Sequence, residues 1–436
     1  MTTPEMQFER AFYDWPRLDT EERLAAFRSL PLERAEELLD CMNAVDQADL
    51  LLTMSKHERR AWLRYLDPDD LADVMQEVPS EDCQVLLDLL DVRTRNEVRA
   101  LMAYAEDDAG GLMSPRFARV RAQMTADEAI RYLRAQSQRR IPLESLYVLD
   151  SDQKLLGEVG LNRLFSARPD EKVADLMDTD LVTAPEDMDQ EEVGALFSRY
   201  DLTVMPVVDD QGRMKGLITV DDVMDVLQEE ATEDAQKYGG MEALDEPYLR
   251  TGILNLIKKR VGWLTLLLMA QMLTAWAMAR YEDELSRALV LAIFVPLIIS
   301  SGGNSGSQAS TLVIRAMAMG EVRLRDWPYV LLRELGSGLI LGSILGIVGF
   351  GRIVFWEYFF HVYGPHYLAL AGTVALSLLG VVLLGCVAGS MLPFILRFLK
   401  FDPASASAPF VATLVDVSGL ILYFTVASIL LTGTLL

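Results

Sequence analysis

The sequence is poor in the side chains that bind transition metals or form disulfides. Its 436 residues include three cysteines and three histidines, with neither a CxxC pair nor an HExxH motif. Zinc clusters, redox disulfides and soft-metal chemistry therefore have few ligands available. The N-terminal stretch MTTPEMQFER lacks an apolar core, so we expect no cleavable signal peptide.

Positive charge is also scarce. The chain has 64 acidic and 40 basic residues, a formal net charge of −24. Residues 261–436 hold nine of each sign, so the whole excess of acid lies in the first 260 residues. Such a chain should not bind nucleic acid, whose phosphates it would repel. A charged half followed by a nearly neutral apolar half excludes a simple soluble enzyme and a secreted disulfide scaffold.

The apolar half contains five segments long enough to cross a bilayer, each near the roughly 20 residues that a spanning helix needs. They are residues 261–280, 288–314, 328–351, 367–396 and 408–434. Lys and Arg gather before the first segment and in the second and fourth loops, while the other side has Arg280, Arg287 and Arg352. By the positive-inside rule we predict a multi-pass protein of the cell inner (plasma) membrane, with its N-terminus cytoplasmic and its C-terminus outside.

A 12-residue period organises the first hundred residues. Its apolar positions are Leu18, Leu30, Met42, Met54, Leu66, Val78, Leu90 and Met102, and a turn or N-cap residue usually follows. Each unit predicts a helix of about two turns. Because so short a helix cannot bury an apolar face alone, we expect a helical solenoid over residues 15–105. A compact helical bundle fits the pattern almost as well.

A second repeat follows, in which two copies read helix, strand, polar turn, strand, helix. The strands fall near residues 146–159 and 205–219 and are rich in β-branched residues. The pattern resembles a tandem pair of CBS domains, a module that commonly binds adenine nucleotides. The resemblance implies a nucleotide element in the second copy, Gly216 to Asp222, with Thr219 and Asp222 as contacts for ATP. The first copy lacks the matching hydroxyl and carboxylate, so at most one such site is implied; a purely structural pair is the alternative.

An acidic helix is predicted after the second copy. Asp222, Asp225, Glu229 and Glu233 are three or four residues apart and share one helix face. Like charges there repel unless a cation bridges them, and oxygen ligands suit Mg²⁺ or Ca²⁺. Simple solvation is the usual explanation of an acidic face. The helix leads toward the first span through apolar residues at 249, 253, 256 and 257, which should lie along the membrane surface.

The second apolar segment contains a run of small residues. Pro296 is followed by the sequence SSGGNSGSQ at 300–308, which we expect to interrupt the helix. Unwound carbonyls beside Asn304 would then meet a hydrated cation. Close helix packing through small residues is the competing interpretation.

Two aspartates stand out near the fifth segment. Asp416 lies well inside it, where an uncompensated charge costs roughly 2.5–3.5 kcal/mol on insertion scales. Its presence indicates an ion path or a partner, although a protonated Asp bonded between helices would also explain it. Asp402, at the inner end of this segment, would either add a carboxylate to an entry vestibule or cap the following helix.

These motifs, in this order, resemble the MgtE family of bacterial magnesium channels and transporters. The resemblance is carried by AEDDAGGLM at 105–113, the CBS pair, EATED at 230–234, KRVGWL at 259–264, Gly302-Gly303-Asn304 and the stretch 402–419. It implies a multidomain membrane protein rather than an enzyme. The implied parts are an all-α cytosolic N-domain (1–113), an α/β tandem CBS pair (114–228), an acidic connecting (plug) helix (229–260) and a transmembrane domain of five helices (261–436).

The family resemblance also implies a function and its residues. It implies a homodimer in the lipid bilayer that lets Mg²⁺ in through a pore between protomers, with Asp416 binding the ion and Ala412, Asn304 and Asp402 nearby. Closure by intracellular Mg²⁺ is implied for a sensor made of Asp69, Asp73, Asp189, Glu191, Asp201, Asp222, Asp225, Glu230, Glu233 and Asp234. Two alternatives stay open: a transporter for another divalent ion (Co²⁺, Ni²⁺, Zn²⁺), and a membrane-anchored nucleotide sensor that conducts nothing.

Overall fold

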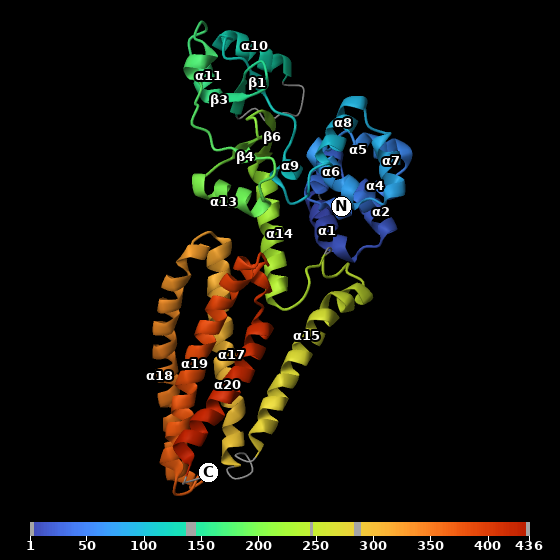
Figure 1. Ribbon diagram of the computed structural model, residues 1–436. Coiled ribbons are helices and arrows are strands. Elements are labelled where there is room, and N and C mark those ends of the chain that lie inside the picture. The colour runs from blue at the N-terminus through green and yellow to red at the C-terminus, as the bar shows by residue number, and fades with distance from the viewer. Residues whose placement is uncertain (1–3, 137–144, 245–246, 283–288, 433–436) are drawn as a thin grey trace. The chain divides into compact units, whose positions relative to one another are not determined.

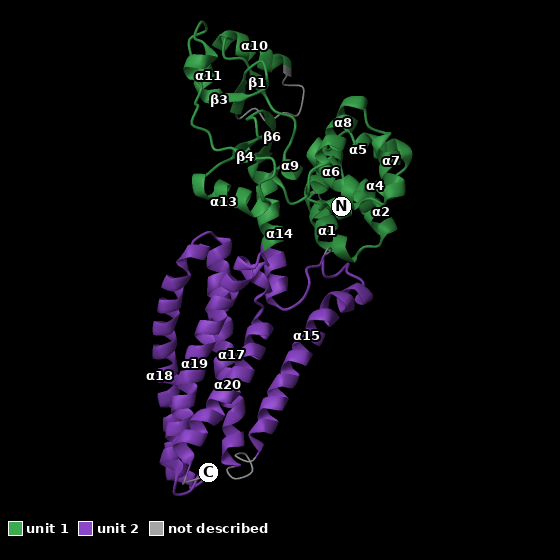
Figure 2. Cartoon of the chain, in the orientation of Figure 1, with its two compact units in different colours: residues 1–230 green, residues 231–436 purple. Residues whose placement is uncertain are grey.

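The structure is a computed structural model that describes residues 4–136, 145–244, 247–282 and 289–432. The chain divides into two compact units, Met1–Glu230 and Ala231–Leu436 (Figure 2). The Arg287 position used for orientation, and the last residues of the predicted fifth segment, lie outside the described residues.

The first unit begins with a series of short helices (blue to cyan in Figure 1). They are α1 Pro4–Asp14, η1 Trp15–Arg17, α2 Thr20–Arg28, α3 Leu32–Asp40, α4 Ala44–Thr53, α5 Lys56–Trp62, α6 Pro68–Glu77, α7 Ser80–Leu87, α8 Val92–Leu101 and α9 Ala109–Leu112. The predicted period is confirmed, because the residue before each of α2 to α8 is the expected N-cap at 19, 31, 43, 55, 67, 79 or 91. Helix α2 packs on α4, α4 on α6 and α6 on α8, which is the stacking of a solenoid.

Polar side chains on the same 12-residue period tie four of the helices to the end of an earlier one. Arg59 donates from Nε to the Leu51 carbonyl at 2.7 Å and from Nη2 to the Leu52 carbonyl at 2.6 Å. Arg95 repeats this with the Leu87 carbonyl at 2.8 Å, and Arg23 and Gln47 make equivalent bonds. These guanidinium and amide groups satisfy carbonyls that a helix C-terminus leaves without partners. The repeat is therefore held by capping as well as by its apolar face.

Two three-stranded sheets follow, with strand orders β1-β2-β3 and β4-β5-β6. In each, the first strand is parallel to the second and the second is antiparallel to the third. The elements are β1 Arg119–Val120, α10 Ala126–Gln136, β2 Ser145–Leu149, β3 Leu155–Gly160, α11 Leu161–Ser166, α12 Val173–Leu176, β4 Ala184–Pro185, α13 Gln190–Tyr200, β5 Val204–Val208 and β6 Met214–Thr219. The predicted repeat is confirmed; the short leading strands β1 and β4 were not foreseen.

The two copies bury their apolar residues differently. The first copy has a core of its own around Val148 and Val159. In the second copy, Val207, Ile218 and Val223 belong to the same core as the solenoid helices. The second copy and the solenoid are thus packed together within the first unit.

The segment from 229 to 260, predicted as one connecting helix, is two helices. Helix α14 runs over Val220–Tyr238 and α15 over Ile253–Arg280. Gly239-Gly240 ends α14, and Gly240 has φ +77°, a left-handed conformation that glycine adopts without strain. The apolar surface segment from 253 onward is therefore the first part of the span helix itself.

The second unit contains five helices long and apolar enough to cross a membrane, as predicted. They are α15, α17 Val290–Ala318, α18 Trp327–Phe360 (preceded by η2 Leu324–Asp326), α19 Tyr367–Phe398 and α20 Ala408–Leu431 (preceded by η3 Pro403–Ser405). Most of their mutual contacts lie among α17, α18, α19 and α20, while α15 packs mainly along α20 (Figure 1).

The predicted interruption of the second span is wrong, because α17 is helical without a break from 290 to 318. Its small residues serve close packing instead. A Cβ on Gly385 of α19 would lie 2.4 Å from the Gly302 carbonyl oxygen, and one on Gly389 would lie 2.0 Å from that of Gly306. The two helices touch through their backbones while both stay helical, so glycine is needed here for lack of space and not for flexibility.

Candidate functional site

Asp416 lies on α20, in the interior of the fifth span, and is partly buried. Gly303 of α17 faces it: a Cβ at Gly303 would lie 3.3 Å from the Ala412 Cβ and 3.7 Å from Asp416 Oδ1. The Gln271 side chain of α15 hydrogen-bonds to the Asp416 carboxyl group, and within the described part of the chain no lysine or arginine acts on it. Three helices therefore meet at a carboxyl group without a cationic partner.

The other residues predicted for the ion site are close in sequence to this contact. Ala412 is one helical turn from Asp416 and lies against Gly303. Asn304 follows Gly303 and is exposed within the chain; its amide donates to Ser300 Oγ at 3.4 Å. The carbonyls around Asn304 are bonded within α17, so backbone ligation by an unwound segment is not available.

Asp402 occupies the turn between α19 and α20. Its Oδ1 accepts a 2.8 Å hydrogen bond from the Ala404 backbone N–H, which caps η3. Its Oδ2 accepts a 2.6 Å bond from Lys237 Nζ at the end of α14. Asp402 therefore caps the short η3 helix, whereas Ser407 caps the span helix α20, and the Asp402 carboxylate also has a lysine partner.

A group of carboxylates gathers in the first unit between α6 and the start of α14. Burial, together with the charges of the neighbouring Asp222 and Asp67, raises the pKa of Asp70 to about 7. Burial also raises the pKa of Asp222 to about 6, against a hydrogen bond from Thr219 that lowers it. Burial, Asp70 and Asp222 hold the pKa of Asp69 well above its usual range. Like charges partly removed from water explain these shifts.

The remaining predicted sensor residues have local bonds or face solvent. Asp189 caps α13 through the Glu191 N–H at 2.8 Å, and Asp201 ends that helix with φ +50°. Glu230 accepts a bond from the Gln190 amide. Asp73, Glu191 and Asp225 are exposed, and Glu233 and Asp234 are partly buried. The negative charges of Asp70 and Asp222 act electrostatically on the Asp73 carboxyl group.

No ready-made metal cage is present among the residues that the structure describes. There, no group of three or more His, Cys, Asp or Glu side chains is arranged to hold a metal ion. The acids come together in pairs and small groups, an arrangement that suits an ion bound through its own water shell, as Mg²⁺ often is.

The candidate nucleotide residues bond to each other at the junction of β6 and α14. Thr219 Oγ1 donates to Asp222 Oδ2, and the Thr219 N–H approaches the same oxygen at 3.4 Å. In the first copy, α11 begins at Gly160 without a side-chain cap. The loss of hydroxyl and carboxylate there thus removes a helix cap as well as the candidate ligands.

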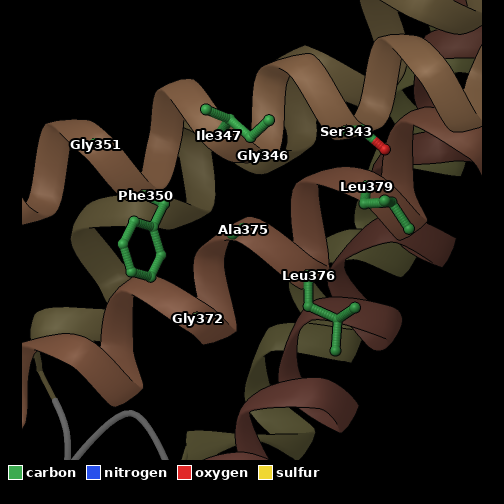
Figure 3. Close-up of a pocket in the computed structure, with 9 residues that line it drawn as sticks. All are labelled: Ser343, Gly346, Ile347, Phe350, Gly351, Gly372, Ala375, Leu376 and Leu379. Carbon is green, nitrogen blue, oxygen red and sulfur yellow. The ribbon is translucent and has the colours of Figure 1, made fainter.

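An apolar groove between α18 and α19 is open to the surroundings (Figure 3). Glycines at 346, 351 and 372 leave it hollow, and Ser343 supplies the hydroxyl among its lining side chains. A lining that is apolar except for one hydroxyl offers too few oxygen atoms to replace the water around a divalent cation. The groove is therefore not a candidate ion path.

Comparisons with known proteins cover almost the whole chain. A family model described as a divalent cation transporter matches residues 295–426, an MgtE intracellular N domain matches 8–107, and a CBS domain matches 173–229. The magnesium transporter MgtE of Thermus thermophilus is 42% identical over 420 residues, which is 96% of this chain and 91% of that protein. This chain belongs to the MgtE family. The Bacillus subtilis magnesium transporter MgtE is 30% identical over 91% of this chain and 84% of its own.

Other similarities are confined to part of the chain. The crystal structure of the cytosolic domain of the Mg²⁺ channel MgtE in complex with ATP is 41% identical, covers 51% of this chain and 93% of that one, and has a TM-score of 0.48. Inosine-5′-monophosphate dehydrogenase of Aquifex aeolicus matches over only 81 residues, 18% of this chain. That match is limited to the CBS region, so membership of a transporter family, and not of an enzyme family, describes the whole protein.

Sequence reasoning missed three residues of these sites. Gln271 is an amide in the middle of an otherwise apolar span, a signal that could have marked it. Asp70 adjoins the predicted Asp69 but was not singled out. Lys237 lies four residues after Glu233, the ordinary spacing of a helical ion pair, although its bond to Asp402 depends on tertiary structure.

Proposed function

We propose that this protein carries Mg²⁺ into the cell down its electrochemical gradient, with Asp416 binding the ion. The observation that carries the proposal is the Asp416 carboxyl group inside a span, facing Gly303 and Ala412 with no cationic partner in the described part of the chain. A buried carboxylate is costly in a bilayer, and a divalent cation would offset that cost. The scarcity of His and Cys favours Mg²⁺ over softer metals.

The proposal includes a homodimer, with the ion path between protomers. Asp416 is only partly buried within one chain, so the open part of its side chain is where a second Asp416 would approach across a two-fold axis. Two carboxylates would hold a hydrated Mg²⁺ through its waters and favour it over monovalent ions by charge. We also propose an inner-membrane location with a cytoplasmic N-terminus, for which the distribution of Lys and Arg among the loops is the support.

We further propose that internal Mg²⁺ closes the path by binding the acidic residues of the cytosolic part. The raised pKa values of Asp70 and Asp222 support this, because carboxylates that repel one another gain most from a shared cation. An adenine nucleotide at Thr219 and Asp222 would have to displace the bond between these two side chains. It would therefore act on a residue of the same acidic group.

Mg²⁺ entry into liposomes loaded with a Mg²⁺ dye tests the transport proposal. We expect flux with the wild type, at least a hundredfold less with Asp416→Asn, and near wild-type flux with Glu334→Gln. The control removes a partly buried carboxylate near the start of α18, away from the Asp416 contact. Equal flux in wild type and Asp416→Asn would move the ion site elsewhere. No flux in the wild type would favour a non-conducting nucleotide sensor, and a preference for Co²⁺, Ni²⁺ or Zn²⁺ would favour a different cargo.

A further inference from the structure

The last turns of α14 belong to the second unit, with the span helices (Figure 2). There Lys237 Nζ donates to Asp402 Oδ2 at 2.6 Å and also pairs with Glu233 Oε1, four residues earlier on α14. The ammonium group thus joins α14 to the turn between α19 and α20. It lies between two carboxylates.

The next residue fixes the same helix end to α17. The Tyr238 hydroxyl donates to the Ser307 carbonyl at 2.8 Å and shares a bond with the Thr311 hydroxyl. Its ring packs beside Ile314, Ala404 and Ala406. Because Tyr238 is bonded to α17, the position of Lys237 beside Asp402 is set by more than its own ion pair.

The charges at this contact do not sum to zero. Two carboxylates share one ammonium group, and the Lys237 side chain is only 29% exposed. The Lys237 ammonium group contacts both carboxylates, Asp402 Oδ2 at 2.6 Å and Glu233 Oε1, and a lysine side chain is ordinarily charged at neutral pH. A compact point charge between two oxygen ligands occupies the place that a small cation would take.

We propose that Lys237 is a built-in counter-ion that occupies a divalent-cation position between Glu233 and Asp402. It keeps the end of α14 docked on the α19–α20 turn in the absence of metal, and it competes with Mg²⁺ for these carboxylates. The contact of Lys237 with Glu233 and Asp402 therefore contributes little to the response of the wild type to Mg²⁺. Lys237 sets how much internal Mg²⁺ is needed to close the path. The last point rests on the proposed function; the docking and the competition do not.

Thermal unfolding of the full chain in detergent, with and without Mg²⁺ at constant ionic strength, tests the competition. Without Mg²⁺, Lys237→Met should melt below the wild type, because Glu233 and Asp402 then repel each other. Mg²⁺ should raise its midpoint by more than it raises that of the wild type. Lys237→Arg keeps the charge and should behave as the wild type does. Lys215→Met is the matched control, since Lys215 pairs with Asp209 in the first unit and is 34% exposed.

Variants at Asp402 test whether the Mg²⁺ that stabilises Lys237→Met binds at this carboxylate. Asp402→Asn retains the oxygen that caps Ala404 but removes the charge. Combined with Lys237→Met, it should abolish the extra stabilisation by Mg²⁺. In liposomes, Lys237→Met should be closed by internal Mg²⁺ at a concentration lower by roughly fivefold or more, the lower end of ordinary coupling between sites.

The proposal is overturned if Lys237→Met gains no more from Mg²⁺ than the wild type, or if Lys237→Arg gains as much as Lys237→Met. Should Lys237→Met fail to fold, Lys237→Gln replaces it with the same expectations. A wild type that carries no Mg²⁺ would refute the proposed function and leave the unfolding test intact.

Discussion

At the scale of single residues, the protein keeps carboxyl groups where water cannot fully solvate them. After burial, the charge of Asp222 raises the pKa of both Asp69 and Asp70, and the charge of Asp70 raises that of Asp69. A surface acid would be solvated and repelled only weakly. Their repulsion lowers the stability of the fold, and either protonation or a bound divalent cation would reduce it. The pH and Mg²⁺ should therefore act on the same carboxyl groups.

Asp70→Asn tests this through the pH dependence of stability. The pKa of Asp70 is raised to about 7 in the folded chain from about 3.9 when unfolded. The folded form therefore holds a proton that the unfolded form has lost between about pH 4 and 7, and stability falls as pH rises through that window. We expect Asp70→Asn to flatten this decline in Mg²⁺-free buffer and to raise the unfolding midpoint at pH 8 by about 2–4 °C.

The matched control is Asp187→Asn, which removes one charge from an exposed residue of the first unit. Its pH profile should follow that of the wild type. Parallel profiles for Asp70→Asn and the wild type would show that the Asp70 carboxyl is solvated in the folded protein.

At the scale of helices, backbone contact between α17 and α19 shapes the membrane part. The run of small residues in α17 is evident in the sequence, but such a run is equally typical of a broken helix and of a tight helix crossing. The choice depended on the glycines of α19, about eighty residues later, which supply the matching surface. No local pattern could reveal that pairing.

Gly385→Ala should disrupt this crossing. Its Cβ would lie 2.4 Å from the Gly302 carbonyl oxygen, a backbone atom that cannot rotate away, and overpacking of this kind costs typically about 1–3 kcal/mol. We expect a lower unfolding midpoint and less folded protein in detergent. Gly372→Ala in the same helix meets nothing within 4 Å and should be neutral or slightly stabilising. Equal effects of the two substitutions would contradict the close crossing.

At the scale of the whole molecule, the net charge of −24 resides in the first 260 residues. If internal Mg²⁺ closes the path there, the effect depends either on particular acids or on bulk charge. Alanine at Glu230, Glu233 and Asp234 together should leave flux open at internal Mg²⁺ that closes the wild type. We expect the half-closing concentration to rise by roughly tenfold or more, a coupling of about 1.4 kcal/mol.

A second triple variant separates these two explanations. Alanine at Asp170, Asp187 and Asp210 removes the same charge from exposed positions and should leave closure unchanged. If both triple variants shift the Mg²⁺ response equally, bulk charge and not a site controls it. The measurement is flux into dye-loaded liposomes at a series of internal Mg²⁺ concentrations.

The sequence by itself determined the features that depend on local pattern. The 12-residue period set the seven N-caps from 19 to 91, hydropathy set the five spans, and the strand repeat set the two sheets. Local capping bonds and burial along one segment are encoded by nearby residues, so they can be read without a structure. Tertiary structure alone decided that α17 is unbroken, that Gly303 faces Asp416 and that Lys237 pairs with Asp402. Each of these joins residues far apart in the chain, and only packing brings such residues together.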